Sequence, residues 1–242
     1  MEYVANRGYA REFPENTLTA FRGGADSADW IEFDVRRCGS GELVVFHDET
    51  LERVTDGEGT VACLPWDDLR ELDVLGSGGS EEYGSTGSRT KSDDGIPRLD
   101  DALDAIPPEV GVQIELKELG IAADVLDAVE RHDNPAILIS FSHLALQEAR
   151  EADPATPLGY ILHDGLYGDD PKLGIDTAAQ LGCEAVHMYY ATGTDPEIIE
   201  YAHDRGLVVQ TAVPDEGPTD RVLETCRSIG VDRLSTDERP SR

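Results

Sequence analysis

Lysine is almost absent from this chain of 242 residues: Lys91, Lys117 and Lys172 stand against 50 aspartates and glutamates. The formal net charge of -30 excludes recognition of nucleic acid or of an anionic membrane surface through a basic patch. A surface dense in acid and poor in lysine is typical of proteins from high salt, because a Debye length of about 3 Å at 1 M salt screens its self-repulsion. We therefore expect a halophilic protein.

Cysteine and long apolar runs are also scarce. The four cysteines are scattered without a C-x-x-C pair, so the sequence indicates neither a zinc site nor a disulfide framework. No apolar run is long enough to span a membrane, and the N-terminus lacks a basic and then apolar signal sequence. We expect a cytoplasmic protein without stable membrane insertion. Hydrophobic residues make up only 39%, but they recur in regular segments, which argues against disorder.

Short apolar segments alternate with amphipathic ones along the whole chain. Eight strands are expected, beginning at Val4 and then over residues 30–35, 111–117, 136–140, 158–162, 185–188, 207–211 and 233–235. Helices are expected between them, which predicts a parallel (β/α)₈ barrel, a TIM barrel of the α/β class. Residues 1–242 are expected to form one domain. The chain stops at Arg242 without room for a full eighth helix, which leaves barrel closure open.

A small insertion is expected after the second strand, over about residues 56–95. Its second part, Leu75–Gly95, is rich in glycine, serine and threonine and predicts a surface loop. The sequence does not decide whether this loop overhangs the site as a lid or is disordered.

Polar residues follow the first expected strand and open the first expected helix. Asn6, Arg7 and Gly8 come directly after the apolar start, and Pro14-Glu15-Asn16-Thr17 precedes an amphipathic run. Polar groups at the carboxyl end of a strand lie where α/β proteins build their sites. We therefore expect functional residues here.

Carboxylates share a face on two further strands. Glu32 and Asp34 point the same way from the strand at 30–35, and Glu115 and Lys117 point the same way from the third strand. Two buried carboxylates on one face need a cation, or one of them must hold a proton. A short strand, 43–46, also delivers His47 and Asp48. A lone histidine is most often structural, and a salt bridge would explain Lys117, so these residues gain weight only from their context.

That context resembles the glycerophosphodiester phosphodiesterase family, which typically begins His-Arg-Gly and continues Pro-Glu-Asn-Thr. Residues 47–55 are similar to the family's His-Asp-x-x-Leu-x-Arg-x-Thr segment, and Glu115–Lys117 to its Glu-x-Lys. The resemblance covers essentially the whole chain. Two positions depart from it, since Asn6 replaces the family's histidine and Gln210 replaces an aromatic residue, often Trp or Tyr.

The carboxyl ends of barrel strands converge on one face, so residues distant in sequence are expected around one pocket. These are Arg7, Glu32, Asp34, His47, Glu115 and Lys117. Three carboxylates with few competing lysines suit a hard divalent cation such as Mg²⁺ or Ca²⁺. Arg7 and Lys117 are the expected partners of a substrate phosphate.

The resemblance implies that a small glycerophosphodiester is hydrolysed to sn-glycerol 3-phosphate and an alcohol, with two histidines sharing the acid and base roles. His47 can take one role, but the amide of Asn6 cannot exchange protons. We therefore expect slow catalysis, because the loss of one acid–base group typically lowers the rate by a factor of roughly 10²–10⁴. His163 and His187 lie at expected strand ends and are candidates for the second role, although pocket lining is the favoured interpretation. Two alternatives stay open: a barrel that binds phosphodiester and metal without turnover, and a phospholipase-type enzyme for a larger lipid headgroup.

Overall fold

The computed structural model describes residues 1–76, 91–92, 94–163, 166–167, 170–214 and 217–240. Eight parallel strands form its centre: β1 (Glu2–Asn6), β2 (Trp30–Arg37), β6 (Gly111–Leu116), β7 (Ala136–Ser140), β8 (Leu158–Ile161), β9 (Ala185–Met188), β10 (Val208–Ala212) and β11 (Arg233–Thr236). They follow one another in this order, and β1 pairs with both β2 and β11. The barrel is therefore closed, and the predicted (β/α)₈ fold is confirmed.

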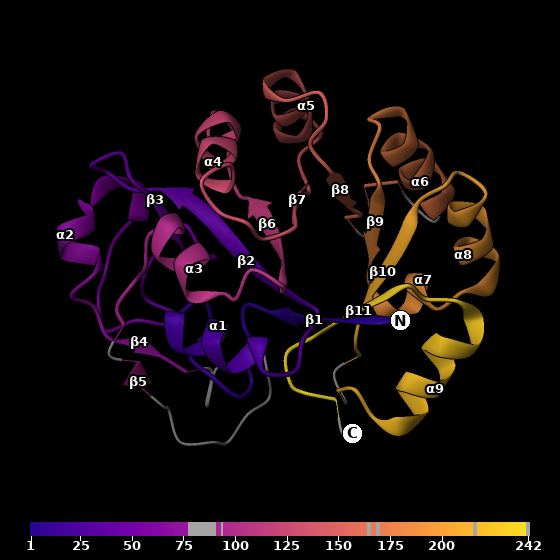
Figure 1. The fold of residues 1–242 in the computed structure, drawn as a ribbon, viewed down its shortest axis with the longest axis horizontal. Coiled ribbons are helices and arrows are strands. Elements are labelled where there is room, and N and C mark those ends of the chain that lie inside the picture. The colour runs from indigo at the N-terminus through magenta and orange to yellow at the C-terminus, as the bar shows by residue number, and fades with distance from the viewer. Residues whose placement is uncertain (77–90, 93, 164–165, 168–169, 215–216, 241–242) are drawn as a thin grey trace.

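Helices surround the barrel (Figure 1). They are α1 (Leu18–Ala25), α3 (Leu99–Ala105), α4 (Ala122–Val129), α5 (His143–Ala152), α6 (Pro171–Gln180), α7 (Tyr190–Gly193), α8 (Pro196–His203) and α9 (Asp220–Ile229). Several helices begin after an N-cap residue. The side chains of Thr17, Ser142 and Thr219 each accept a hydrogen bond from a backbone N–H in the first turn of the helix that follows. The helix α7, which directly follows β9, was not predicted.

Alternation along the strands separates an apolar layer from a polar interior. On β2, Ile31, Phe33 and Val35 pack into the core between barrel and helices, so Glu32 and Asp34 point into the barrel. A smaller cluster that includes Ile137 and other barrel residues packs separately from that core. The sequence pattern thus places carboxylates inside the barrel, where the site can form.

The insertion has a small core of its own. Strand β3 (Leu43–Val45) runs antiparallel to the end of β2, and Phe46, Leu51, Val61 and Leu69 belong to one buried cluster. This segment also carries a short 3₁₀ helix (Val61–Cys63), α2 (Trp66–Leu69), and the antiparallel pair β4 (Val74–Leu75) and β5 (Lys91–Ser92). The surface loop expected over 75–95 is therefore replaced at both ends by this strand pair; residues 77–90 and 93 lie outside the described residues.

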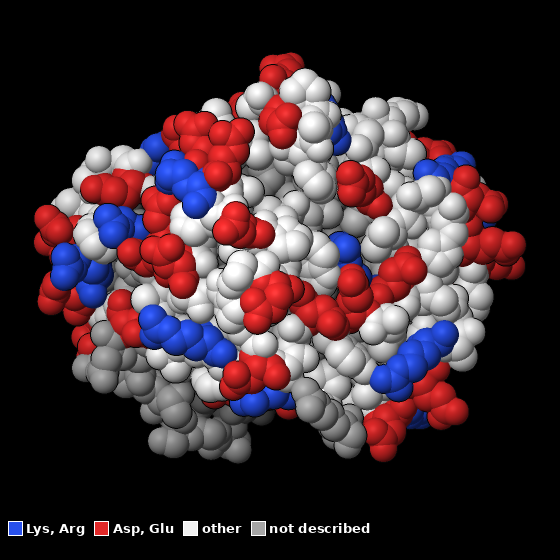
Figure 2. Space-filling model, viewed as in Figure 1, with Lys and Arg blue, Asp and Glu red and all other residues white. Residues whose placement is uncertain are grey.

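No helix among the described residues is both long and apolar enough to cross a membrane. Figure 2 shows aspartates and glutamates spread over the visible face of the molecule, with lysine and arginine side chains scattered among them.

The net charge of -30 leads to a prediction about salt. Repulsion among surface carboxylates destabilises the compact state at low ionic strength and is largely screened at about 1 M salt. We expect the melting temperature to rise steeply between dilute buffer and molar KCl, as measured by circular dichroism. A melting temperature that does not change with salt would contradict the halophilic interpretation.

Candidate functional site

A cavity of about 440 Å³ opens at the carboxyl ends of the strands. Five of the predicted site residues line it: Asn6, Arg7, Glu32, His47 and Glu115. The other two, Asp34 and Lys117, lie directly behind this lining, since Lys117 Nζ is 2.8 Å from Glu115 Oε1 and 3.5 Å from Asp34 Oδ1. The structure therefore gathers all seven residues, but Lys117 contacts carboxylates and is not part of the cavity wall.

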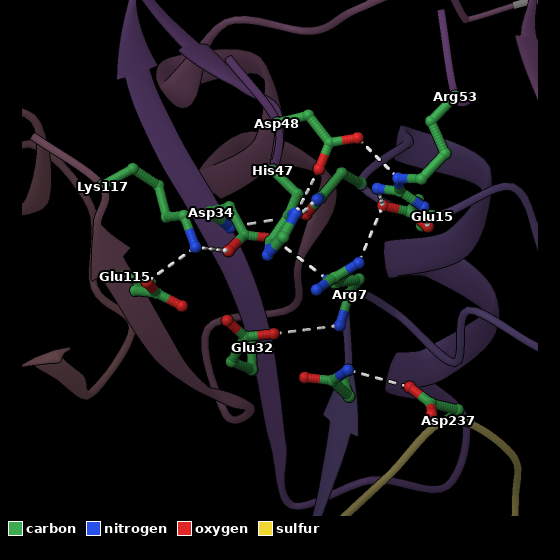
Figure 3. Close-up of polar contacts among 12 residues, drawn as sticks. Arg7, Glu15, Glu32, Asp34, His47, Asp48, Arg53, Glu115, Lys117 and Asp237 are labelled. Carbon is green, nitrogen blue, oxygen red and sulfur yellow. Dashed lines mark hydrogen bonds and ion pairs between the residues drawn. The ribbon is translucent and has the colours of Figure 1, made fainter. Parts of the chain in front are cut away.

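Three buried carboxylates meet at one side of this cavity. Glu32 and Asp34 come from β2 and Glu115 from β6, where Asp34 and Glu115 are register partners. Each can offer an oxygen such that the three oxygens lie within 4.8 Å of one another. Figure 3 shows this group beside Arg7 and Lys117. The prediction that Glu32 and Asp34 point to the same face of their strand is confirmed. Together with Glu115 they form a cluster with the composition and spacing of a cation site.

The three carboxylates differ in how their charge is balanced. Burial and the neighbouring Asp34 raise the pKa of Glu32 well above its usual range, and the same two causes raise that of Glu115. Burial would also raise the pKa of Asp34, but Arg7, His47, Lys117 and the Asn16 hydrogen bond together outweigh it and hold this pKa well below the usual range. Asp34 is therefore the fixed negative charge, whereas the two glutamates are crowded anions that a cation would stabilise.

The turn after β1 requires the residue types found there. Arg7 has a φ of 48°, and its backbone N–H donates to Glu32 Oε2 at 3.1 Å. Gly8 has a φ of 77°, and a Cβ at this position would lie 2.7 Å from Ala20 in α1. Because only glycine tolerates both conditions, Gly8 allows the chain to fold back and present the Arg7 amide to the site.

Glu15 anchors a buried charge network that the sequence did not reveal. Its side chain is 1% exposed and contacts Arg7 Nη1 at 3.0 Å and Arg53 Nη2 at 2.7 Å. Burial would raise the pKa of Glu15, but the charges of Arg7 and Arg53 lower it. The glutamate thus fixes an arginine of the site to an arginine of the insertion.

We predict that Glu15→Gln lowers the free energy of unfolding by about 3 kcal/mol, because it leaves two largely buried arginines without their shared carboxylate. The stabilisation by a carboxylate with a lowered pKa is complete above its unfolded value of about 4.3 and is lost as the pH falls through its folded value. Urea unfolding at pH 7 and pH 4 measures both effects. The difference between wild type and Glu15→Gln should shrink at the lower pH; an equal difference at both would contradict this role.

His47 is oriented from the insertion side. Its Nδ1 lies 2.6 Å from Asp48 Oδ1, and Arg53 contacts the other oxygen of Asp48. Arg53 also donates to Glu15, so the histidine is tied through two side chains to the network described above. The second ring nitrogen, Nε2, is then the one available for proton exchange with a molecule in the cavity.

The two other candidate histidines are differently placed. His187 is 6% exposed, lines the cavity, and has a pKa lowered by burial to about 3, so its ring is neutral and cannot serve as a cationic acid. His163 is exposed, contacts the ring of Phe141, and is not a lining residue of this cavity. Gln210 pairs its amide reciprocally with Gln113 at 2.7 and 3.0 Å across the interior. This pairing gives the buried amide of Gln210 a hydrogen-bond partner at the position where the family usually has an aromatic residue.

Asp237 is a titratable residue of the cavity lining to which the sequence analysis gave no role. Asp237 directly follows β11, and its Oδ1 accepts a hydrogen bond of 2.8 Å from Asn6 Nδ2. Its position at the carboxyl end of a strand is the signal that could have singled it out.

Comparisons with known proteins agree with one another. The model of the glycerophosphoryl diester phosphodiesterase family matches residues 7–239. A glycerophosphodiester phosphodiesterase from Caldanaerobacter subterraneus subsp. tengcongensis is 29% identical over 97% of this chain and 93% of its own length. The crystal structure of glycerophosphodiester phosphodiesterase from Agrobacterium tumefaciens has a TM-score of 0.78 at 28% identity and covers 98% of this chain and 96% of its own. An Oleispira antarctica phosphodiesterase in complex with the product sn-glycerol-3-phosphate has a TM-score of 0.78 at 25% identity, covering 98% and 93%.

Proposed function

The chain belongs to the glycerophosphoryl diester phosphodiesterase family and is an enzyme that acts on phosphodiesters, and we propose that it hydrolyses a glycerophosphodiester to sn-glycerol 3-phosphate and an alcohol with the help of a divalent cation. One observation carries the proposal: three carboxylate oxygens within 4.8 Å of one another adjoin a cavity that Arg7 and His47 also line. The product bound by the Oleispira relative supports the same product here.

The residues present fit a hard cation. Glu32, Asp34 and Glu115 offer oxygen only, which suits Mg²⁺ or Ca²⁺ better than zinc. Glu32 Oε2 accepts from the Arg7 amide and Glu115 Oε1 from Lys117, so each glutamate keeps a second oxygen for the cation. A bound cation would neutralise part of the phosphate charge and polarise a phosphoryl oxygen.

The side chains of this chain would divide the remaining work. Arg7 lines the cavity and is proposed to contact the phosphate, while Lys117 adds positive charge from behind the two carboxylates that it contacts. His47, held through Nδ1 by Asp48, is proposed to take a proton from the attacking water. Asn6 would hold a substrate oxygen or orient its neighbours, since an amide does not exchange protons usefully.

A second candidate substrate class is supported by the apolar part of the cavity lining. This part comprises Ile139, Phe141, Ile161, Leu162, Met188 and Val213, beside the polar His187, Tyr189 and Gln210. Apolar surface in the same cavity as a charged phosphate site favours a phosphodiester whose glycerol carries an acyl chain, such as a lysophospholipid.

The test is an assay in molar KCl with glycerophosphocholine and lysophosphatidylcholine, each with Mg²⁺, with Ca²⁺ and with a chelator. Release of sn-glycerol 3-phosphate from glycerophosphocholine that stops with chelator supports the proposal. Turnover of the lysolipid alone would select the second class. Saturable binding of both substrates without product would show a barrel that binds but does not turn over.

We predict that Glu115→Gln removes most of the cation affinity, because it takes one of three anionic ligands from the site. In the wild type, titration calorimetry should give about one divalent ion per chain, and the ion should raise the melting temperature. The matched control is Glu118→Gln, which changes a nearby carboxylate that accepts from the Arg37 amide instead. Equal Ca²⁺ and Mg²⁺ affinity in Glu115→Gln and wild type would remove this residue from the site.

A further inference from the structure

Position 6 carries an amide, yet a carboxyl group lies next to it. Strands β1 and β11 are parallel neighbours with Ala5 opposite Thr236, so the residues that follow, Asn6 and Asp237, come side by side at the mouth of the barrel. Asn6 Nδ2 donates to Asp237 Oδ1 at 2.8 Å, and both residues line the cavity. The barrel thus brings a second titratable group to the point where Asn6 itself cannot exchange a proton.

Asp237 is held firmly in this position. Its backbone carbonyl accepts a hydrogen bond from the Arg11 amide at 2.9 Å. On the turn that contains Asp237, Thr236 Oγ1 donates to the carbonyl of Glu238 at 2.8 Å. Asn6 occupies only Oδ1. Among the described residues no protein group donates to Oδ2, so this oxygen of a cavity-lining residue can carry a proton.

The surroundings of the carboxyl group allow it to be protonated. Asn6 and Arg7 face it from β1 and the turn after it, and Arg11 and Glu15 face it from the segment before α1. Burial raises the pKa of Asp237 above its usual range, although the Asn6 hydrogen bond and the two arginines oppose this shift. A carboxyl group with a raised pKa keeps its proton to a higher pH than an ordinary aspartate does, which suits it to act as an acid.

We propose that Asp237 is a catalytic residue and supplies the proton to the departing alcohol. This rests on the proposed phosphodiesterase function. Water oxygen forms a bond to phosphorus and gives its proton to His47, the bond from phosphorus to the alcohol oxygen breaks, and that oxygen takes the proton of Asp237. Bulk water then returns a proton to Asp237 and removes the one on His47.

The arrangement of the two groups is consistent with this division. In the view of Figure 3, Arg7 lies between His47 and Asp237, which puts the proposed base and the proposed acid on different sides of the arginine that is proposed to contact the phosphate. Attacking and leaving oxygens lie roughly in line in phosphoryl transfer, which requires such a separation.

The test compares Asp237→Asn in two backgrounds, wild type and Asn6→His. Asparagine keeps an oxygen for the Asn6 amide but has no proton to give, so kcat should fall by about 100-fold or more. Divalent-cation affinity and melting temperature should stay unchanged, and the alkaline limb of the pH–rate profile should disappear, because activity with an acid is lost as the pH rises through its pKa. Adding Asn6→His to Asp237→Asn should raise kcat at least about 10-fold above that of Asp237→Asn, because an imidazole can then donate the proton.

Glu238→Gln is the matched control, since it changes the adjacent carboxyl group, which is not a lining residue of the cavity. Asp237→Asn activity within threefold of wild type at every pH would overturn the inference, as would a double variant no better than Asp237→Asn, because a structural defect is not repaired by an added imidazole. A wild type that binds cation and substrate without turnover would overturn the proposed function as well. Turnover that is indifferent to Asp237 would overturn the inference alone.

Discussion

Replacing His47 with alanine should lower kcat by roughly 10²–10⁴-fold, the usual contribution of one acid–base group. The reason lies in its surroundings: Asp48 holds Nδ1 at 2.6 Å, and Arg53 holds Asp48, so the ring is oriented with Nε2 available to the cavity. Steady-state kinetics on glycerophosphocholine in molar KCl measure the loss. KM should change little, because the ring acts on the proton of the nucleophile and not on the bound phosphate.

His203→Ala is the control for this prediction. His203 is a half-exposed residue of α8 that contacts Asp232, on the outside of the barrel. Its loss should leave kcat unchanged. If His47→Ala kept more than about a tenth of wild-type kcat, the proton of the nucleophile would go elsewhere, and the role assigned to this histidine would be wrong.

The barrel and the carboxylate cluster could be predicted because both follow from local periodicity. Alternation along β2 puts Glu32 and Asp34 on the face opposite Ile31 and Phe33, and the apolar side is buried against helices. Once eight strands are counted, closure brings the carboxyl ends together, so Glu115 on β6 had to lie near Asp34. These inferences need no knowledge of side-chain contacts.

The contacts between distant segments could not be predicted in this way. Glu15 and Arg53 are 38 positions apart, and Gln113 and Gln210 are 97 apart, so neither pair leaves a periodic signal. The core of the insertion was missed for a similar reason. Its apolar residues, such as Leu51 and Leu69, are few and widely spaced, and they become a core only when the chain folds over β3.

Position 6 joins these two kinds of evidence. The sequence identified Asn6 as a departure from the family pattern, but only the register of β1 with β11 places Asp237 beside it. Burial raises the pKa of Asp237 above its usual range, whereas a carboxyl group starts from an ordinary pKa of about 3.9 and an imidazole from about 6.5. Because a proton donor acts only while it is protonated, catalysis that depends on Asp237 should be lost as the pH rises.

Asn6→His should raise turnover of a glycerophosphodiester by roughly 100-fold at neutral pH, the lower end of what an acid–base group contributes. The two side chains have similar length, the position lines the cavity, and the imidazole can keep the hydrogen bond to Asp237. Since the native acid loses its proton as the pH rises, the ratio of variant to wild-type kcat should be larger at pH 7 than at pH 5. Kinetics across this range measure the ratio directly.

Adding His47→Ala should abolish the gain, because acid and base act as a unit and their effects do not add. A gain that survives His47→Ala would mean that the new imidazole works as a base on its own. If wild type is already fast and Asn6→His changes nothing, position 6 does not limit catalysis, and Asp237 already supplies the proton at an adequate rate. If both forms bind cation and substrate but stay inert, the defect lies outside position 6, and binding without turnover becomes the function that the site supports.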